Sequence, residues 1–121
     1  MSSSIPQIDL ADINSSLGHD AQGLVNWAVG LGLTSIVTTN FRPFEAVILH
    51  MCARAQPDMR VIWMDNGYNT EATYQFADEV TKQLGLNLSI YLPRRSRAHR
   101  EAVEGAVPAL DDPRHAAFTE E

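Results

Sequence analysis

The sequence predicts an α/β protein, a three-layer sandwich built on a short parallel sheet of about three strands. Three short runs rich in apolar residues, at 34–39, 60–64 and 87–91, alternate with segments of helical periodicity. The length of 121 residues, 45% of them hydrophobic and 20% charged, fits one globular domain. Because crossovers between parallel strands are right-handed, all three strands should end at one edge of the sheet, where such proteins bind ligands.

Composition narrows the classes of function. The formal net charge of −6 argues against broad attraction to nucleic acid or to anionic membranes. No apolar run could span a membrane, and the first residues do not resemble a signal peptide, so we expect a cytoplasmic protein. Cys52 is the only cysteine, which excludes an internal disulfide and an iron–sulfur cluster or multi-cysteine zinc site within this chain. The four histidines share no metal-like spacing, so no metal ligand is assigned.

The chain is expected to begin with a loose, polar N-terminal arm, residues 1–19, with a short helical turn. Residues 20–121 should form a single α/β domain. Asp20 is placed to cap a helix that continues to about Leu31, where Gly32 ends it.

The segment from Thr34 to Arg54 predicts a strand, a tight polar turn and a helix with Pro43 in its first turn. Glu45 also lies in that first turn, where the helix dipole favours a negative charge. The turn consists of Thr38, Thr39, Asn40, Phe41 and Arg42. Its hydroxyl, amide, N–H and guanidinium groups can converge on an anion at the helix N-terminus, which predicts a phosphate site. The alternative is that Thr39 or Asn40 only caps the helix.

The second apolar run, 60–64, ends at the polar turn Asp65-Asn66-Gly67, which leads into a helix. Thr70 is placed to cap this helix, and Gly85 has the position of a C-cap. The residues expected on its inward face are Ala72, Phe76, Val80 and Leu84. A third strand follows at 87–91. Asp65 could accept a hydrogen bond from a ribose hydroxyl or a metal-bound water, although turn capping explains it equally well.

The tail that follows Pro93 is rich first in arginine and then in acidic residues. We expect a helix over about 96–104 and a poorly packed end from about residue 105. One interpretation of the arginines is a solvated surface on which Arg97 and Glu101 form an i,i+4 ion pair. The other is that Arg94 and Arg95 close the crevice at the sheet edge over a polyanionic ligand. No catalytic triad, carboxylate pair or glycine-rich phosphate loop is found, so no catalytic residue is assigned.

Two stretches resemble motifs of the sulfonucleotide reductases. Val37-Thr38-Thr39-Asn40-Phe41, followed by Glu45-Ala46-Val47, is similar to the S-S-F-G-x-x-A-A-V phosphate-binding turn of that family. Met64-Asp65-Asn66-Gly67-Tyr68, followed by Thr73-Tyr74 and Phe76, is similar to its D-T-G-Y…E-T-Y-x-F segment. In order and spacing the chain resembles the N-terminal half of a phosphoadenosine phosphosulfate reductase. The fold implied is a truncated version of the adenine-nucleotide α-hydrolase-like fold.

This resemblance implies a nucleotide site and a reaction. The residues that would hold a phosphate or sulfate group are Thr38, Thr39, Asn40 and Phe41. Positive charge would come from Arg42, Arg94 and Arg95, and the nucleoside would lie beside Asp65, Asn66 and Gly67. The family reduces an adenosine phosphosulfate-type nucleotide with a cysteine thiolate, which releases sulfite and is reset by thioredoxin. The pathway implied is assimilatory sulfate reduction, which leads to cysteine biosynthesis.

The sequence also departs from the family pattern. Arg42 stands where the family has Gly, Asn66 replaces Thr, and Ala72 stands where an acidic residue is common. The E-C-G-L-H type catalytic cysteine of the family's later half is absent from this chain, as are the cysteine pairs that hold a cluster in adenylylsulfate-using relatives. We therefore expect no bound cofactor, with thioredoxin as reductant if the full enzyme is present. Whether this chain has enzyme activity is left open.

Two classes of function follow from the sequence. The first is the sulfonucleotide-binding half of a reductase, and the alternative is a non-catalytic nucleotide-binding or interaction module that kept the fold. An ATP-pyrophosphatase-type enzyme lacks support, because its S-G-G-x-D-S loop is not seen. If the sheet ends as predicted, the 34–39 strand is an edge, so we expect a homo-oligomer or pairing with a complementary chain.

Overall fold

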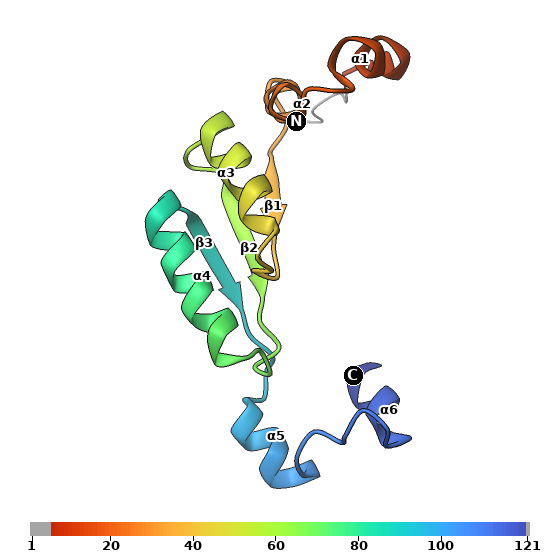
Figure 1. Ribbon diagram of the computed structural model, residues 1–121, viewed down its shortest axis with the longest axis vertical. Coiled ribbons are helices and arrows are strands. Elements are labelled where there is room, and N and C mark those ends of the chain that lie inside the picture. The colour runs from red at the N-terminus through yellow and green to blue at the C-terminus, as the bar shows by residue number, and fades with distance from the viewer. Residues whose placement is uncertain (1–5, 121) are drawn as a thin grey trace.

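The computed structural model describes residues 6–120, which form six helices and three strands (Figure 1). Their bounds are α1 Leu10–Leu17, α2 Ala21–Val29, β1 Ile36–Thr38, α3 Glu45–Ala55, β2 Arg60–Met64, α4 Glu71–Leu84, β3 Asn87–Tyr91, α5 Arg97–Glu104 and α6 Arg114–Glu120. The described part of the chain contains no helix long and apolar enough to cross a membrane.

The three strands form one parallel sheet in the order β1-β2-β3. The register aligns Val37 with Val61 and Val61 with Leu88, so these residues lie in one row across the sheet. The predicted α/β class and parallel sheet are therefore confirmed. The strand β1 lies at an edge, as expected.

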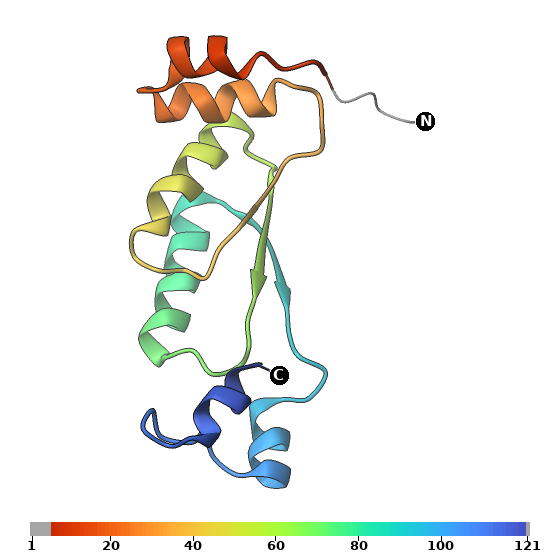
Figure 2. The same cartoon turned by 90° about the vertical axis from the view of Figure 1, so that its right-hand side faces the viewer.

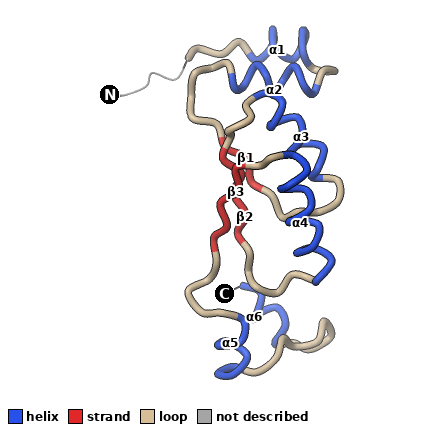
Figure 3. The backbone as a smooth tube through the Cα atoms, turned by 90° about the vertical axis from the view of Figure 1, so that its left-hand side faces the viewer, coloured by secondary structure: helices blue, strands red, loops and turns tan. Residues whose placement is uncertain are grey.

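Helices α3 and α4 cover one face of the sheet (Figures 2 and 3). Both lie on the same side because the two crossovers have the same hand and the strand order does not reverse. Between these helices and the sheet lies the core, whose buried members are Phe41, Leu49, Val61, Trp63, Ala77 and Val80. The rings of Phe41 and Trp63 meet edge to face at 4.9 Å, which places the turn after β1 against the centre of the sheet.

The opposite face of the sheet is not covered by any helix among residues 6–120 (Figure 2). One side chain from each strand shows this exposure: Ile36 is 53% exposed, Met64 71% and Tyr91 54%. Parallel sheets normally bury both faces. The described residues thus supply the sheet and one helical layer of the expected sandwich.

Local capping signals agree with the structure at several helix ends. Asp20 and Thr70 accept hydrogen bonds from backbone N–H groups of α2 and α4, and Ser96 does the same for α5. Gly85 ends α4 in the left-handed conformation, with φ of 63°. These are the caps that short-range sequence patterns specify best.

Three expectations need correction. The N-terminal arm contains a full helix, α1, because Asp9 caps it. The helix α2 ends at Val29 with Gly30 as its cap, two residues before the predicted end. On α4, Ala72 is exposed and Ala77 is buried instead, because residues five apart lie roughly 140° apart around a helix.

The end of the chain, which was expected to be poorly packed, forms a helix, α6 (Figure 1). No residue of α6 is buried, but the ring of Phe118 contacts two side chains of earlier segments. It meets the Tyr68 ring edge to face at 5.3 Å, and the Arg100 guanidinium lies 3.9 Å from its centre. These contacts hold α5 and α6 beyond the carboxyl ends of the strands (Figure 2).

We expect Gly85→Ala to lower the free energy of unfolding by about 1–2 kcal/mol, because Ala is disfavoured at positive φ. Apart from the glycine's immediate surroundings along the chain, no atom lies within 4 Å of the place a Cβ would occupy, so the loss reflects backbone conformation. Gly85→Asn is the matched control and should lose less, since Asn tolerates this conformation. Urea denaturation measures both, and equal losses would contradict this account.

Candidate functional site

The turn after β1 is closed by a carboxylate of the following helix. The Thr39 hydroxyl donates to Oε2 of Glu45 at 2.6 Å, and the backbone N–H of Asn40 donates to the same oxygen at 2.7 Å. The N–H of Phe41 donates to the Thr39 hydroxyl at 2.9 Å. Thr39 is only 5% exposed, so its hydroxyl is committed to this network. The sequence placed Glu45 in the first turn of the helix, and no contact with Thr39 was predicted. The only sequence signal for this contact was an acidic residue six positions after Thr39.

The pKa of Glu45 lies below its ordinary value. Burial by itself raises the pKa, but hydrogen bonds from the Thr39 hydroxyl and from the backbone of Asn40 and Arg42 lower it. The positive charge of Arg42 lowers it further. Glu45 is therefore a carboxylate at neutral pH, and the donors of the turn already hold a negative charge.

The turn after β2 is organised by Asp65, which is 7% exposed. Its Oδ1 accepts from the Gly67 N–H at 2.9 Å, from the Asn69 amide at 2.9 Å and from the Tyr74 hydroxyl at 2.8 Å. Burial and the hydrogen bond to Asp65 raise the pKa of Tyr74, so its hydroxyl remains a donor. In this structure the Asp65 side chain caps the turn, which is one of the two roles expected for it from the sequence.

A polar pocket of about 420 Å³ lies between the two turns, at the carboxyl ends of β1 and β2. It is lined by Asn40, Phe41, Arg42, Pro43, Met64, Asn66, Asn69 and Thr73. Four of the predicted site residues, three from the first turn and one from the second, therefore share this pocket. Thr38 and Thr39 do not line it. Amide groups, a hydroxyl and a guanidinium together can bind an anionic or hydroxyl-rich ligand.

The arginines after β3 lie in a different hollow. Arg94 and Arg95 line a space of about 570 Å³ together with Pro93, His99 and Arg100. Arg95 forms an ion pair with Glu104. Arg97 forms an ion pair with Glu101 at 2.9 Å, which is the i,i+4 pair that the solvated-surface interpretation predicted. Asn66 and Pro93 line a smaller hollow of about 290 Å³ with Asp65, between the ends of β2 and β3. The structure thus brings Asn66 to the first turn but does not bring Arg94 and Arg95 into the same pocket.

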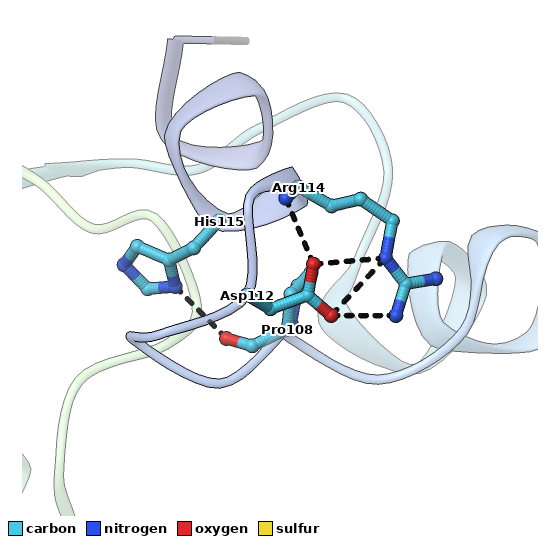
Figure 4. Close-up of polar contacts among 4 residues, drawn as sticks. All are labelled: Pro108, Asp112, Arg114 and His115. Atoms are coloured by element: carbon cyan, nitrogen blue, oxygen red, sulfur yellow. Dashed lines mark hydrogen bonds and ion pairs between the residues drawn. The ribbon is translucent and has the colours of Figure 1, made fainter.

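The segment before α6 is held by its own polar contacts (Figure 4). The Arg114 side chain donates to Asp112, with Nη2 2.7 Å from Oδ2, and these hydrogen bonds lower the pKa of Asp112 to about 2. Nδ1 of His115 lies 2.8 Å from the Pro108 carbonyl, which can only accept, so Nδ1 carries the proton.

Among the described residues no group of three acidic, histidine or cysteine side chains could hold a metal ion.

Cys52 is buried within α3. Burial raises the pKa of its thiol, so the reactive thiolate is disfavoured. Cys52 therefore lacks the exposure and the acidity that a catalytic thiol needs.

The fold and the site define an α/β protein with a polar pocket at the carboxyl edge of a parallel sheet. The crystal structure of phosphoadenylyl-sulfate reductase from Candida auris, a phosphate complex, has this fold: the TM-score is 0.71 at 21% identity, over 95% of this chain and 57% of that chain. The sequence model of the phosphoadenosine phosphosulfate reductase domain matches residues 34–111. The chain therefore belongs to the phosphoadenosine phosphosulfate reductase family.

Individual relatives support this membership. Phosphoadenosine 5′-phosphosulfate reductase from a Synechococcus species is 41% identical over 102 residues, which are 81% of this chain and 43% of that protein. The protein of the same name from Alteromonas mediterranea is 44% identical over 100 residues, 81% of this chain and 40% of the relative. The chain thus spans less than half the length of these relatives.

We expect Tyr74→Phe to lower the free energy of unfolding by about 1–2 kcal/mol, because it removes a hydrogen bond to the Asp65 carboxylate. Tyr91→Phe is the matched control, since Tyr91 is 54% exposed and no hydrogen bond of its hydroxyl is found within residues 6–120. Thermal or urea unfolding compares the two variants. If both variants lost the same stability, the hydrogen bond to Asp65 would not be what stabilises the turn.

Proposed function

We propose that this chain is the sulfonucleotide-binding half of a phosphoadenosine phosphosulfate reductase-like protein. The observation that carries the proposal is the polar pocket formed by Asn40, Arg42 and Asn66, in a chain of this family. The guanidinium of Arg42 meets the phosphate or sulfate groups, and the Asn66 side of the pocket meets the nucleoside. Thr38 and Thr39, together with Gly67, support the two turns, while Arg94 and Arg95 add positive charge nearby.

The reaction proposed for the complete protein is thioredoxin-dependent reduction of the bound sulfonucleotide to sulfite, in cytoplasmic sulfate assimilation and cysteine biosynthesis. It needs a thiolate nucleophile, and buried Cys52 is unsuited to that role. The nucleophile must therefore come from outside these 121 residues. No metal or iron–sulfur cluster takes part in the proposed mechanism.

The second candidate is a nucleotide-binding module without catalysis. The observation that favours it is the same buried Cys52, the only cysteine of the sequence. Both candidates predict the same pocket. They differ in whether sulfite is formed when thioredoxin is supplied.

Calorimetry with adenosine 3′-phosphate 5′-phosphosulfate and with adenosine tests the pocket. We expect the phosphosulfate to bind more tightly, and Arg42→Ala to weaken its binding by about tenfold, since one charge-assisted hydrogen bond is lost. Arg54→Ala is the control, because it removes the same charge at the far end of α3. Equal affinity for adenosine and for the phosphosulfate would reject the assignment.

We also propose that the uncovered sheet face associates with a second copy or with a complementary chain. Exposed Ile36 and Met64 lie on that face, and β1 offers an unpaired edge. The wild-type chain should therefore associate at micromolar concentration, and Met64→Lys should weaken the association. Val47→Lys, on the exposed side of α3, is the control. Sedimentation showing a monodisperse wild-type monomer would reject this proposal.

A further inference from the structure

The carboxylate of Glu45 accepts hydrogen bonds from two donors of the turn after β1. Its Oε2 lies 2.6 Å from the Thr39 hydroxyl and 2.7 Å from the Asn40 backbone nitrogen. These are the two inner donors of the turn, and both point at this one oxygen. An oxygen of a phosphate or sulfate would need the same two donors.

The surroundings of the turn keep Glu45 in place. Thr39 is buried, and the Phe41 N–H donates to its hydroxyl, so the hydroxyl proton is directed toward Glu45. Arg42 adds attraction through its positive charge, which is among the causes of the lowered pKa of Glu45. The negative charge of Glu45 therefore already lies beside the positive charge of Arg42 in this turn.

The neighbouring pocket offers a second set of polar groups. Asn40 and Arg42 line it, whereas Glu45 and Thr39 do not. An anionic ligand in the pocket can thus approach Arg42, whereas the Thr39 hydroxyl belongs to a residue outside the lining.

We propose that Glu45 is a specificity-determining residue that excludes phosphate and sulfate groups from the inner donors of the turn. The inference rests on the proposed function, because it concerns how the same site meets a sulfonucleotide. The negative charge of Glu45 repels an incoming anion, and its oxygen competes for the Thr39 hydroxyl and the Asn40 N–H. Anionic groups of the ligand are left to Arg42.

The test is binding of inorganic sulfate to the complete chain at neutral pH, followed through the amide resonance of Asn40. Glu45→Ala should bind sulfate about tenfold more tightly than the wild type, with the largest shift at Asn40, because one close negative charge is removed. Glu71→Ala is the matched control, since Glu71 is the first residue of α4 as Glu45 is of α3. It should leave sulfate binding unchanged.

Glu45→Gln decides the question if Glu45→Ala does not fold. Its side-chain oxygen still accepts from Asn40 but carries no charge, so we expect a smaller gain, about threefold. Unchanged sulfate binding in the folded variant, or an equal gain in Glu71→Ala, would overturn the inference.

The outcomes also separate this inference from the proposed function. If the wild type binds the phosphosulfate nucleotide but Glu45→Ala gains no sulfate affinity, the role of Glu45 is rejected and the proposed function stands. If Glu45→Ala gains sulfate affinity and no form of the chain prefers the nucleotide over adenosine, the proposed function is rejected and the role of Glu45 stands.

Discussion

The carboxylate of Asp65 joins the parts of the structure on which the candidate site depends. One of its oxygens accepts three hydrogen bonds, from the Gly67 backbone and from the side chains of Asn69 and Tyr74. Its own N–H donates to the carbonyl of Tyr91 at 2.9 Å. A buried carboxylate is costly unless its oxygens are hydrogen-bonded, so this set of contacts fixes the turn. The end of β2, the start of α4 and the end of β3 are thereby held together beside the pocket.

The sheet that carries these turns is complete on one face only. Right-handed crossovers without a reversal of strand order place α3 and α4 together, and the core of Phe41, Leu49 and Trp63 lies beneath them. The other face presents apolar side chains such as Met64 to solvent. A parallel sheet needs helices on both faces to bury both, and residues 6–120 supply helices on one face only.

The two turns at the sheet edge use their carboxylates differently. Asp65 is surrounded by neutral donors from its own turn and from α4, whereas Glu45 is bound by donors of a turn that resembles a phosphate-binding motif. In the first case the charge shapes a pocket wall. In the second it accepts hydrogen bonds from Thr39 and Asn40, while Arg42 lines the neighbouring pocket.

The sequence by itself determined the class of fold, the family and most of the local structure. Strands 60–64 and 87–91, the cap at Thr70 and the left-handed Gly85 follow from propensities and hydrogen bonds over a few residues. The tertiary structure decided which groups the polar side chains contact. Burial sets the partners of Thr39 and Asp65, and packing of Phe118 against Tyr68 brings α6 back to the sheet edge. Such contacts join residues that local patterns treat separately, because their strength depends on which groups folding removes from water.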